Sequence, residues 1–335
     1  MRWLLECTVF KFHIKIKSGK TRLFYGGGGE VAVYLRQYLK QFLNTIDIMM
    51  TRWGTINEST LIIEDFSALG QISLVSALTV LQAMNYTTAA LPTAILSTQT
   101  EGFGTPKKLT TDQWMQQAIN HWQLVPDLDF NGALIGYLGN TRLIPLIETL
   151  LTKKLGNRPV IVDPVMGDEG KLYPGLDQEY VKQIRHLCTH ATIITPNWTE
   201  LCLLTGKSTT LVATPDNAKK MLNDLQRIGI EADVIITGVE VQKRAGCVFQ
   251  SREEGFEFVG QPKVAGHFYG TGDTFAALLL GYLLRDQSLS NAVKRATALV
   301  YQAILETAAD QEVANRKYGL KLGKLIQSIV SENQN

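Results

Sequence analysis

Short apolar segments and segments with helical spacing alternate along this chain of 335 residues from Thr60 onward. Apolar residues spaced three and four positions apart predict helices, for example over residues 73–84 and 215–228. Short apolar runs between them predict strands at residues 61–63, 87–96, 132–135, 159–162, 192–194 and 234–236. Strands that alternate with helices form mostly parallel sheets with helices on both faces. We therefore expect an α/β fold with a mostly parallel central sheet.

Polar residues follow several of these predicted strands at the point where each strand ends. In open parallel sheets, ligands bind outside the carboxyl ends of the strands, so polar residues at these positions indicate a site. The residues concerned are Asp65, Tyr137, Asp163, the run Thr195-Pro196-Asn197, and Thr237-Gly238. One such residue could be ordinary turn chemistry, but their repetition at one strand end after another predicts a binding site.

Residues 270–273, with the sequence Gly-Thr-Gly-Asp, precede the apolar run 274–284, which predicts a buried helix. The first N–H groups of a helix lack internal partners, and together with the helix dipole they favour a bound anion. Asp273 would repel a bound phosphate, but it could accept a proton from an attacking hydroxyl group. The alternative is that Asp273 only caps the helix.

Two further carboxylates lie next to predicted strand ends. Asp163 is followed by Pro164, and Glu200 comes three residues after Asn197 at a predicted helix start. Magnesium prefers oxygen ligands and takes few of them from protein, so Asp163 and Glu200 could bind it directly or through water. The alternatives are a plain turn at Asp163 and a capping box, in which Glu200 accepts from the N–H of Asn197.

The composition limits the classes of partner. The chain has 33 basic and 31 acidic residues and a formal net charge of +2, which favours neither nucleic acid nor an anionic membrane. The four cysteines form no CxxC pair and are expected as reduced thiols. The five histidines show no HExxH or other ligand spacing, so we expect no zinc site. No signal peptide or membrane-length apolar run is evident, and we expect a cytoplasmic protein.

Residues 1–58 do not continue the strand–helix alternation. They are rich in lysine and arginine and contain four consecutive glycines at positions 26–29. Residues 18–21, Ser-Gly-Lys-Thr, resemble the end of a P-loop, but Ile14 stands where that loop needs its first glycine. Residues 31–48 could form an amphipathic helix. We predict an N-terminal extension over 1–58, poorly ordered or translated from an upstream start, and one domain over 59–335.

Several motifs taken together resemble one family. They are DFSALGQISL (65–74), PTAILSTQTEGF (92–103), GYLG (136–139), DPVMGDEGKLY (163–173), ITPNWTEL (194–201), ITG (236–238) and GHFYGTGDTFA (267–277). From Ile62 to about Leu305 the chain is similar to the vitamin B6 kinases (pyridoxal, pyridoxine and pyridoxamine kinases) of the ribokinase-like superfamily. Residues 1–58 have no counterpart in that family.

The resemblance implies a ribokinase-like fold and ATP-dependent phosphorylation of the 5′-hydroxymethyl group of a B6 vitamer. It also implies Mg²⁺ as a cofactor and a homodimer, and it leaves a monovalent-cation requirement open. By motif match, Asp273 would be the catalytic base, with Gly270, Thr271 and Gly272 as the anion hole.

The same resemblance implies three sets of ligand-binding residues. The magnesium ligands, direct or through water, would be Asp163 and Glu200. The residues that would bind ATP are Asp163, Asp168, Thr195, Asn197, Glu200, Thr237, Gly270, Thr271 and Gly272. The residues that would bind the vitamer are Asp65, Thr100, Glu101, Tyr137 and Asp273.

The chain departs from the family pattern at a few positions. Gln99 stands where a histidine is frequent, and Tyr269 where a proline is common. The pyrimidine kinases of thiamine synthesis share the DPVM and TPNxxE motifs but usually carry cysteine in place of Asp273. Hydroxymethylpyrimidine kinase is therefore the alternative enzyme. A vitamer-binding protein without activity is the non-enzymatic alternative, although such a protein has no need of a base at Asp273.

Overall fold

The computed structural model describes residues 14–17, 20–23, 58–126, 128–251, 255–310 and 312–334. The chain divides into two units, residues 1–56 and 57–335, which are described separately. In the first unit, β1 (Ile14–Lys17) and β2 (Lys20–Leu23) pair as antiparallel strands. The helix predicted over 31–48 and the glycines at 26–29 lie outside the described residues. The independence of residues 59–335 stays a prediction.

The second unit is built on a nine-stranded sheet in the order β13-β12-β11-β10-β7-β6-β3-β4-β5. From β11 to β4 all neighbouring strands are parallel, and the outer strands β5, β12 and β13 pair antiparallel. This confirms the expected α/β fold. The strands are β3 (Glu58–Ser67), β4 (Thr88–Leu96), β5 (Lys108–Thr110), β6 (Asp129–Ile135), β7 (Val160–Val162), β10 (Ile193–Ile194), β11 (Asp233–Val241), β12 (Arg244–Ser251) and β13 (Gly255–Pro262).

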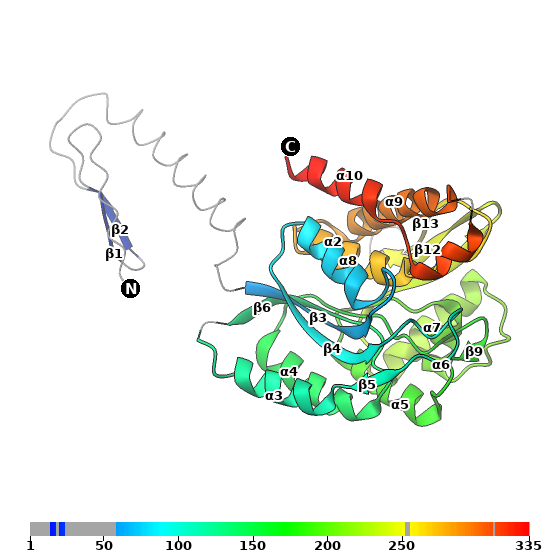
Figure 1. Ribbon diagram of the computed structural model, residues 1–335, viewed down its shortest axis with the longest axis horizontal. Helices are drawn as coiled ribbons and strands as arrows, with labels where there is room; N and C mark the ends of the chain where they lie inside the picture. Colours follow the sequence, from blue (N-terminus) through cyan, green and yellow to red (C-terminus); the bar gives the residue numbers. More distant parts are fainter. Residues whose placement is uncertain are drawn as a thin grey trace. The chain divides into compact units, whose positions relative to one another are not determined.

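Helices cover both faces of this sheet (Figure 1). One face carries α3 (Asp112–Trp122), α4 (Ile144–Lys154), α5 (Gln178–Leu187), α6 (Trp198–Thr205) and α7 (Pro215–Arg227). The other carries α2 (Leu74–Ala83), α8 (Thr271–Leu283), α9 (Leu289–Ala308) and α10 (Gly323–Asn333). Short elements complete the unit, namely η1 (Thr141–Leu143), η2 (Cys188–His190), η3 (Val313–Tyr318) and the hairpin β8 (Gly167–Asp168) and β9 (Lys171–Leu172).

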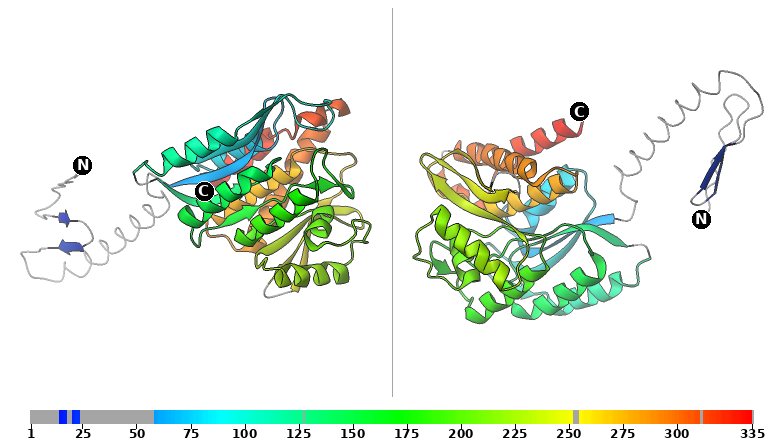
Figure 2. Two further views of the ribbon diagram at one scale, coloured as in Figure 1. Left: turned by 90° about the horizontal axis from the view of Figure 1, so that it is seen from below. Right: turned by 180° about the vertical axis from the view of Figure 1, so that it is seen from behind.

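Side chains of the central strands alternate between two separate cores. On β3, Leu61 and Ile63 belong to the core under α3 to α7, whereas Ile62 belongs to the core under α2 and α8 to α10. Because both faces are buried, such strands read as continuous apolar runs rather than as alternating ones. Figure 2 shows the helices on the two faces of the sheet from below and from behind.

Helix α8 is buried on every side, as its apolar sequence predicts. All of its residues from Thr274 to Tyr282 are buried. Gly281 allows the close packing of α8 on α2, because a Cβ there would lie 2.4 Å from Sδ of Met84. The hydroxyl of Tyr86 donates to the carbonyl of Gly281 at 2.9 Å. This packing holds the C-terminal half of α8 against the end of α2.

The prediction that Asp65 follows the first strand is wrong in detail. Strand β3 continues to Ser67, and its register with β4 shifts between Glu64 and Phe66. A bulge in a strand re-aims a side chain, so Asp65 can face the cavity while remaining inside the strand. No helix of the described residues has the length and apolarity that crossing a bilayer requires.

Candidate active site

A cavity of about 600 Å³ lies where the sequence predicts a site. Every predicted site residue except Thr195 lines it: Asp65, Thr100, Glu101, Tyr137, Asp163, Asp168, Asn197, Glu200, Thr237, Gly270, Thr271, Gly272 and Asp273. Thr195 lies below the surface of the cavity, with 2% of its area exposed. The structure therefore brings together residues from distant parts of the chain, as expected from the ends of neighbouring parallel strands.

Asp273 sits in the first turn of α8, three residues after a left-handed glycine. Gly270 has φ 80° and precedes the helix, so the chain turns there in a conformation that favours glycine. The backbone N–H of Ser73 donates to Oδ2 of Asp273 at 2.7 Å. Ser73 itself has φ 49°, which is uncommon for a residue other than glycine. The carboxylate is thus held between the start of α2 and the start of α8.

The environment of Asp273 suits a base. Burial raises the pKa of Asp273 to about 6, the N–H of Ser73 opposes this rise, and the charge of Asp65 adds to it. A general base works best when its pKa lies near the working pH, because it is then largely ionised and still accepts a proton readily.

Asp163 faces the same glycine turn from the end of β7. A Cβ placed on Gly272 would lie 3.4 Å from Oδ2 of Asp163, so this carboxylate approaches the helix start closely. Burial, followed by the charge of Asp273, raises the pKa of Asp163 to about 7. A buried carboxylate whose ionisation is opposed by a neighbouring carboxylate marks a place where a cation would be stabilised.

Glu200 is held firmly at the start of α6. Asn197 and Glu200 form the capping box: the N–H of Glu200 donates to Oδ1 of Asn197, and the N–H of Asn197 donates to Oε2 of Glu200, each at 2.9 Å. Oε1 of Glu200 also accepts from the N–H of Met166 at 3.1 Å. The helix-cap interpretation of Glu200 is therefore correct, and it does not exclude a role through water at the cavity surface.

These carboxylates fit a magnesium site in their chemistry. Asp163 and Glu200 offer oxygen atoms at the cavity, and burial raises the pKa of both. The charge of Asp273 adds to the rise for Asp163, and the charge of Asp163 adds to the rise for Glu200. A divalent cation would remove that electrostatic cost. Few protein ligands and several water or phosphate oxygens are the usual surroundings of magnesium.

The rim on the side of β11 is made of backbone turns. The N–H of Thr237 donates to the carbonyl of Pro196 at 2.9 Å, and the register of β11 shifts between Ile236 and Val239. Asp168 begins the turn of the β8–β9 hairpin, in which Glu169 and Gly170 both have positive φ. Positive φ at both central residues is the geometry of a type I′ hairpin turn, which places Asp168 at the cavity edge.

The opposite side of the cavity carries the residues predicted to hold the vitamer. Ser67 donates from Oγ to Oδ2 of Asp65 at 3.1 Å. Burial raises the pKa of Asp65, and the side-chain hydrogen bonds of Ser73 and Ser67 oppose the rise. Burial also raises the pKa of the Tyr137 hydroxyl, with the charge of Asp65 as a second cause.

Comparison with known proteins identifies the family. The family model described as phosphomethylpyrimidine kinase matches residues 75–317. The pyridoxal kinase of Lactobacillus plantarum has a similar crystal structure, with a TM-score of 0.76, 38% identity, and coverage of 83% of this chain and 98% of that one. The chain belongs to the phosphomethylpyrimidine kinase family.

Other members of the family differ in how much of their length is matched. A crystal form, with pyridoxal, of a candidate phosphomethylpyrimidine kinase from Bacteroides thetaiotaomicron gives a TM-score of 0.74 and 31% identity, covering 81% of this chain and 95% of that one. The pyridoxal kinase of Arabidopsis thaliana is 27% identical over 74% of this chain and 81% of its own length. The matched segments span 64% of a Caenorhabditis elegans relative and 46% of a Schizosaccharomyces pombe relative.

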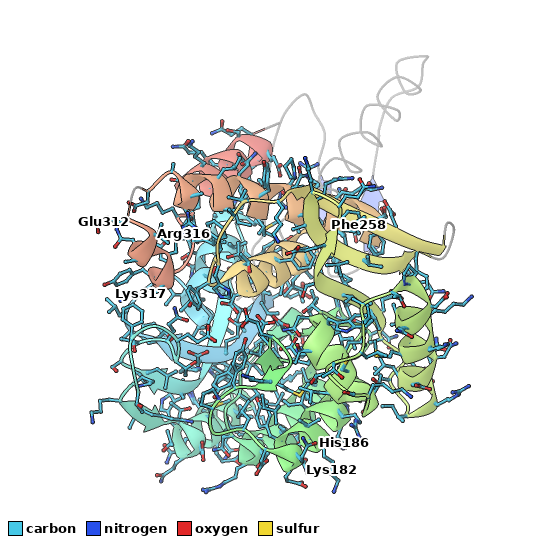
Figure 3. The ribbon with its side chains drawn as sticks, turned by 90° about the vertical axis from the view of Figure 1, so that its right-hand side faces the viewer. Lys182, His186, Phe258, Glu312, Arg316 and Lys317 are labelled. Atoms are coloured by element: carbon cyan, nitrogen blue, oxygen red, sulfur yellow. The ribbon has the colours of Figure 1, made fainter. Side chains whose placement is uncertain are left out.

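In this family member, η3 connects two loops at the cavity. The side chain of Gln99 donates from Nε2 to the carbonyl of Lys317, and Nζ of Lys317 lies 4.4 Å from the centre of the Phe103 ring. Arg316 donates from Nη1 to the carbonyl of Ala265 at 3.1 Å. Figure 3 shows Arg316 and Lys317 next to each other on this segment. Residues 99–103 and 265–268, which border the cavity, are thus held by one C-terminal turn.

The sequence analysis missed some of these contributors. Ser73 acts through its backbone N–H, which leaves no mark in residue type. Glu64 is buried beside the site, with Oε2 lacking a hydrogen-bond partner among the described residues. Burial, then the charges of Asp273, Asp65 and Asp163, raises the pKa of Glu64 well above its usual range. Two adjacent carboxylates, Glu64 and Asp65, within an otherwise apolar strand were the sequence feature that could have indicated Glu64 as part of the site.

Proposed function

We propose that this chain transfers the γ-phosphoryl group of ATP to the 5′-hydroxymethyl group of a B6 vitamer. The observation that carries the proposal is the half-buried Asp273, held by the N–H of Ser73 beside the left-handed turn at Gly270. A base next to the free N–H groups of a helix start is what phosphoryl transfer to an alcohol requires. A protein that only binds the vitamer has no use for it.

The protein's own groups supply three parts of the reaction. Asp273 accepts the proton of the vitamer hydroxyl group. The hydroxyl oxygen forms the new bond to phosphorus while the bond from phosphorus to ADP breaks and ADP departs. The N–H groups that follow Gly270 hold the phosphoryl oxygens while negative charge is spread over them. Asp65 and Tyr137, together with the loop of Thr100 and Glu101, orient the vitamer from the other side of the cavity.

Magnesium belongs to this proposal as a cofactor. Asp163 and Glu200 would hold it directly or through water, and the ion would neutralise charge on the ATP phosphates. Asp168, Thr195, Asn197 and Thr237 are proposed as the remaining ATP-binding residues. Of these, Thr195 is buried and would act through Asp163, because its side-chain hydrogen bond to Asp163 opposes the rise in the pKa of that carboxylate.

A B6 vitamer is favoured over a pyrimidine as the substrate. The Lactobacillus plantarum protein, which covers most of this chain at 38% identity, is named a pyridoxal kinase. The Bacteroides protein compared above carries the pyrimidine kinase name but has a crystal form with pyridoxal. Asp273 also stands where the pyrimidine kinases usually carry cysteine.

The experiment is a competition between substrates in one ATP-consumption assay. Purified protein receives ATP and Mg²⁺ with pyridoxal, pyridoxine, pyridoxamine or hydroxymethylpyrimidine. We expect the highest kcat/KM with one of the three vitamers and formation of its 5′-phosphate. A preference for hydroxymethylpyrimidine would assign the chain to the thiamine branch of the family. Vitamer binding without ATP consumption would support the non-enzymatic alternative.

We also infer a homodimer in the cytoplasm, with no nucleic-acid or membrane partner. The family resemblance supports the dimer, and the near balance of basic and acidic residues supports the absence of polyanionic partners. Cys188, Cys202 and Cys247 are buried and free, as expected for a reducing compartment. Light scattering of the purified protein measures the assembly, and a fluorescent fusion measures the location.

A further inference from the structure

A second cluster of side chains with ligand chemistry lies away from the cavity. Glu148 is on α4, His186 is in the last turn of α5, and His190 ends η2. None of the three lines the active-site cavity, and α4 packs against both α5 and η2. No zinc site was expected from the sequence, because the histidines show no HExxH or other ligand spacing. His186 and His190 are nevertheless four residues apart, and only the fold adds Glu148 to them.

The distances between the three side chains are close to those of a metal site. Oε1 of Glu148 lies 3.5 Å from Nε2 of His186 and 3.9 Å from Nε2 of His190. All three ligand atoms lie within 4.8 Å of one another. Zinc binds such atoms at about 2.0–2.2 Å in a tetrahedron, whose corners are then about 3.3–3.6 Å apart. The distances from Oε1 of Glu148 to the two imidazole nitrogens, 3.5 and 3.9 Å, are close to that spacing.

One oxygen of the carboxylate in this cluster accepts no hydrogen bond, although both imidazoles lie within ion-pair distance of it. Oε1 of Glu148 is buried, and no described residue donates a hydrogen bond to it. A buried acceptor without a partner costs free energy, and a cation in contact with it would remove that cost. The side chains of Glu148, His190 and His186 are 18%, 33% and 62% exposed, so the cluster opens to solvent on the side of His186.

The ligand types select the class of metal. Two imidazole nitrogens and one carboxylate oxygen suit zinc and similar transition metals, whereas magnesium and calcium prefer oxygen ligands alone. Cys188 is no ligand, because it is buried in the apolar core, where burial raises the pKa of its thiol far above the usual range. Lys182 lies one turn before His186 at the same edge (Figure 3), but it is exposed and 3.9 Å from Glu179, so its charge is screened.

We propose that Glu148, His186 and His190 bind a divalent transition-metal ion of the zinc class, with water completing its coordination. The ion links α4 to the junction of α5 and η2. Because the unfolded chain does not hold these three ligands together, binding stabilises the fold, and the stabilisation grows with the logarithm of the free metal concentration once this exceeds the dissociation constant. The kinase proposal does not depend on this site.

The test is a zinc titration of the full-length protein after removal of metals. Calorimetry with zinc chloride should show a site whose affinity falls at least about 10-fold in His190→Ala and in Glu148→Gln, since each loses a direct ligand. His121→Ala, which changes an exposed histidine on α3, is the matched control and should bind like the wild type. The melting temperature should rise with zinc in the wild type and in the control, and less in the two variants.

X-ray absorption at the zinc edge separates this site from the carboxylates of the cavity. Imidazole scattering that disappears in His190→Ala supports the proposal. Zinc surrounded by oxygen alone would place it at Asp163 and its neighbours and overturn the proposal. Equal zinc affinity in the wild type, His190→Ala and Glu148→Gln would also overturn it. Circular dichroism of each variant confirms that a loss of binding is not a loss of folding.

Discussion

The backbone N–H of Ser73 donates to Oδ2 of Asp273 at 2.7 Å, although the two residues lie 200 positions apart in the chain. This bond joins the first residues of α2 to the first turn of α8. It orients the Asp273 carboxylate toward the cavity and partly offsets the cost of burying its charge. The base of the proposed reaction is therefore placed by backbone geometry as much as by its own side chain.

Replacing Asp273 with asparagine should remove the base and leave the fold intact. Asn can still accept the N–H of Ser73, so vitamer and ATP binding should change little. Turnover should fall by about 10²–10⁴-fold, which is the contribution of general-base catalysis. Steady-state kinetics with ATP and the preferred vitamer measures this. If the variant keeps most of its turnover at the same hydroxyl group, Asp273 is not the base.

The same substitution should make the protein more stable at neutral pH. The pKa of Asp273 rises from 3.8 to about 6 on folding, so ionisation destabilises the folded state as pH rises from 3.8 to about 6. Above that range Asp273→Asn should gain on the order of 2–3 kcal/mol over the wild type. Below pH 3.8 the gain should vanish. Urea unfolding at several pH values tests this, and a gain that does not depend on pH would contradict it.

The rate should fall on the acid side because Asp273 must be ionised to accept a proton. Burial raises its pKa to about 6, so kcat/KM for the vitamer should decline as pH decreases through that value. Asp163 faces the same turn, and burial together with the charge of Asp273 raises its pKa to about 7, so Mg²⁺ must saturate the site if the profile is to report Asp273. A pH profile of the wild type with saturating Mg²⁺ is the measurement. If kcat/KM declines instead near the ordinary pKa of an aspartate side chain, the raised pKa of Asp273 does not hold during catalysis.

Neutralising Asp163 should raise the Mg²⁺ concentration needed for half-maximal rate. Asp163→Asn and Glu200→Gln each remove negative charge from the place where the ion is proposed to bind. Asp177→Asn is the matched control, because Asp177 caps α5 by accepting from the N–H of Tyr180 and does not line the cavity. An unchanged Mg²⁺ dependence in both active-site variants would leave Asp163 as a turn residue and Glu200 as a helix cap only.

The fold and most of the cavity could be predicted from the sequence for a simple reason. Parallel strands bring their carboxyl ends to one edge, so Asp163 and Thr237 were expected to line one cavity once their strands were recognised. Thr237 does not follow its strand as predicted, because β11 continues to Val241 through a shift of register between Ile236 and Val239. Strand β5 was missed because its three residues are exposed and carry no apolar pattern. The β8–β9 hairpin was missed because it consists of two strands of two residues each, around the turn at Glu169.

Contacts that depend on tertiary packing could not be predicted in this way. The N–H of Ser73 meets Asp273 only because α2 packs on α8. The turn of η3 reaches Gln99 only because the chain returns across the cavity after α9. Glu148 meets His190 because α4 lies beside η2. The two residues of each pair lie far apart in the sequence, so no spacing pattern predicts their contact. Each pair is a candidate for a role that residue type alone does not indicate.

Removing residues 1–48 should leave the kinase domain folded and active. The described strands and helices of the second unit begin with β3 at Glu58, so expression from Met49 removes none of them. We expect ATP and vitamer kinetics within a few-fold of the full chain and a similar melting temperature. The alternative is that residues 31–48 form a helix that packs on the domain or on a partner subunit. An insoluble or strongly destabilised short form would show that the segment belongs to the fold.

Lys317 should affect the binding of the vitamer more than that of ATP. Its ammonium group lies 4.4 Å from the centre of the Phe103 ring and 3.4 Å from the carbonyl of Gly102. Thr100 and Glu101 precede these residues in the loop and line the cavity. Lys317→Ala should raise the KM for the vitamer about 2–5-fold, the value of a solvent-exposed cation–π contact. The kcat and the KM for ATP should stay within about two-fold.

Lys324→Ala is the control for this substitution. Lys324 is an exposed lysine of the C-terminal region that lies on α10 and does not line the cavity. It should leave both KM values unchanged. A selective change in the vitamer KM for Lys317→Ala alone would show that η3 positions the loop that carries Thr100 and Glu101. An equal change in both KM values, or none, would mean that the contact of Lys317 with Phe103 serves only the stability of the fold.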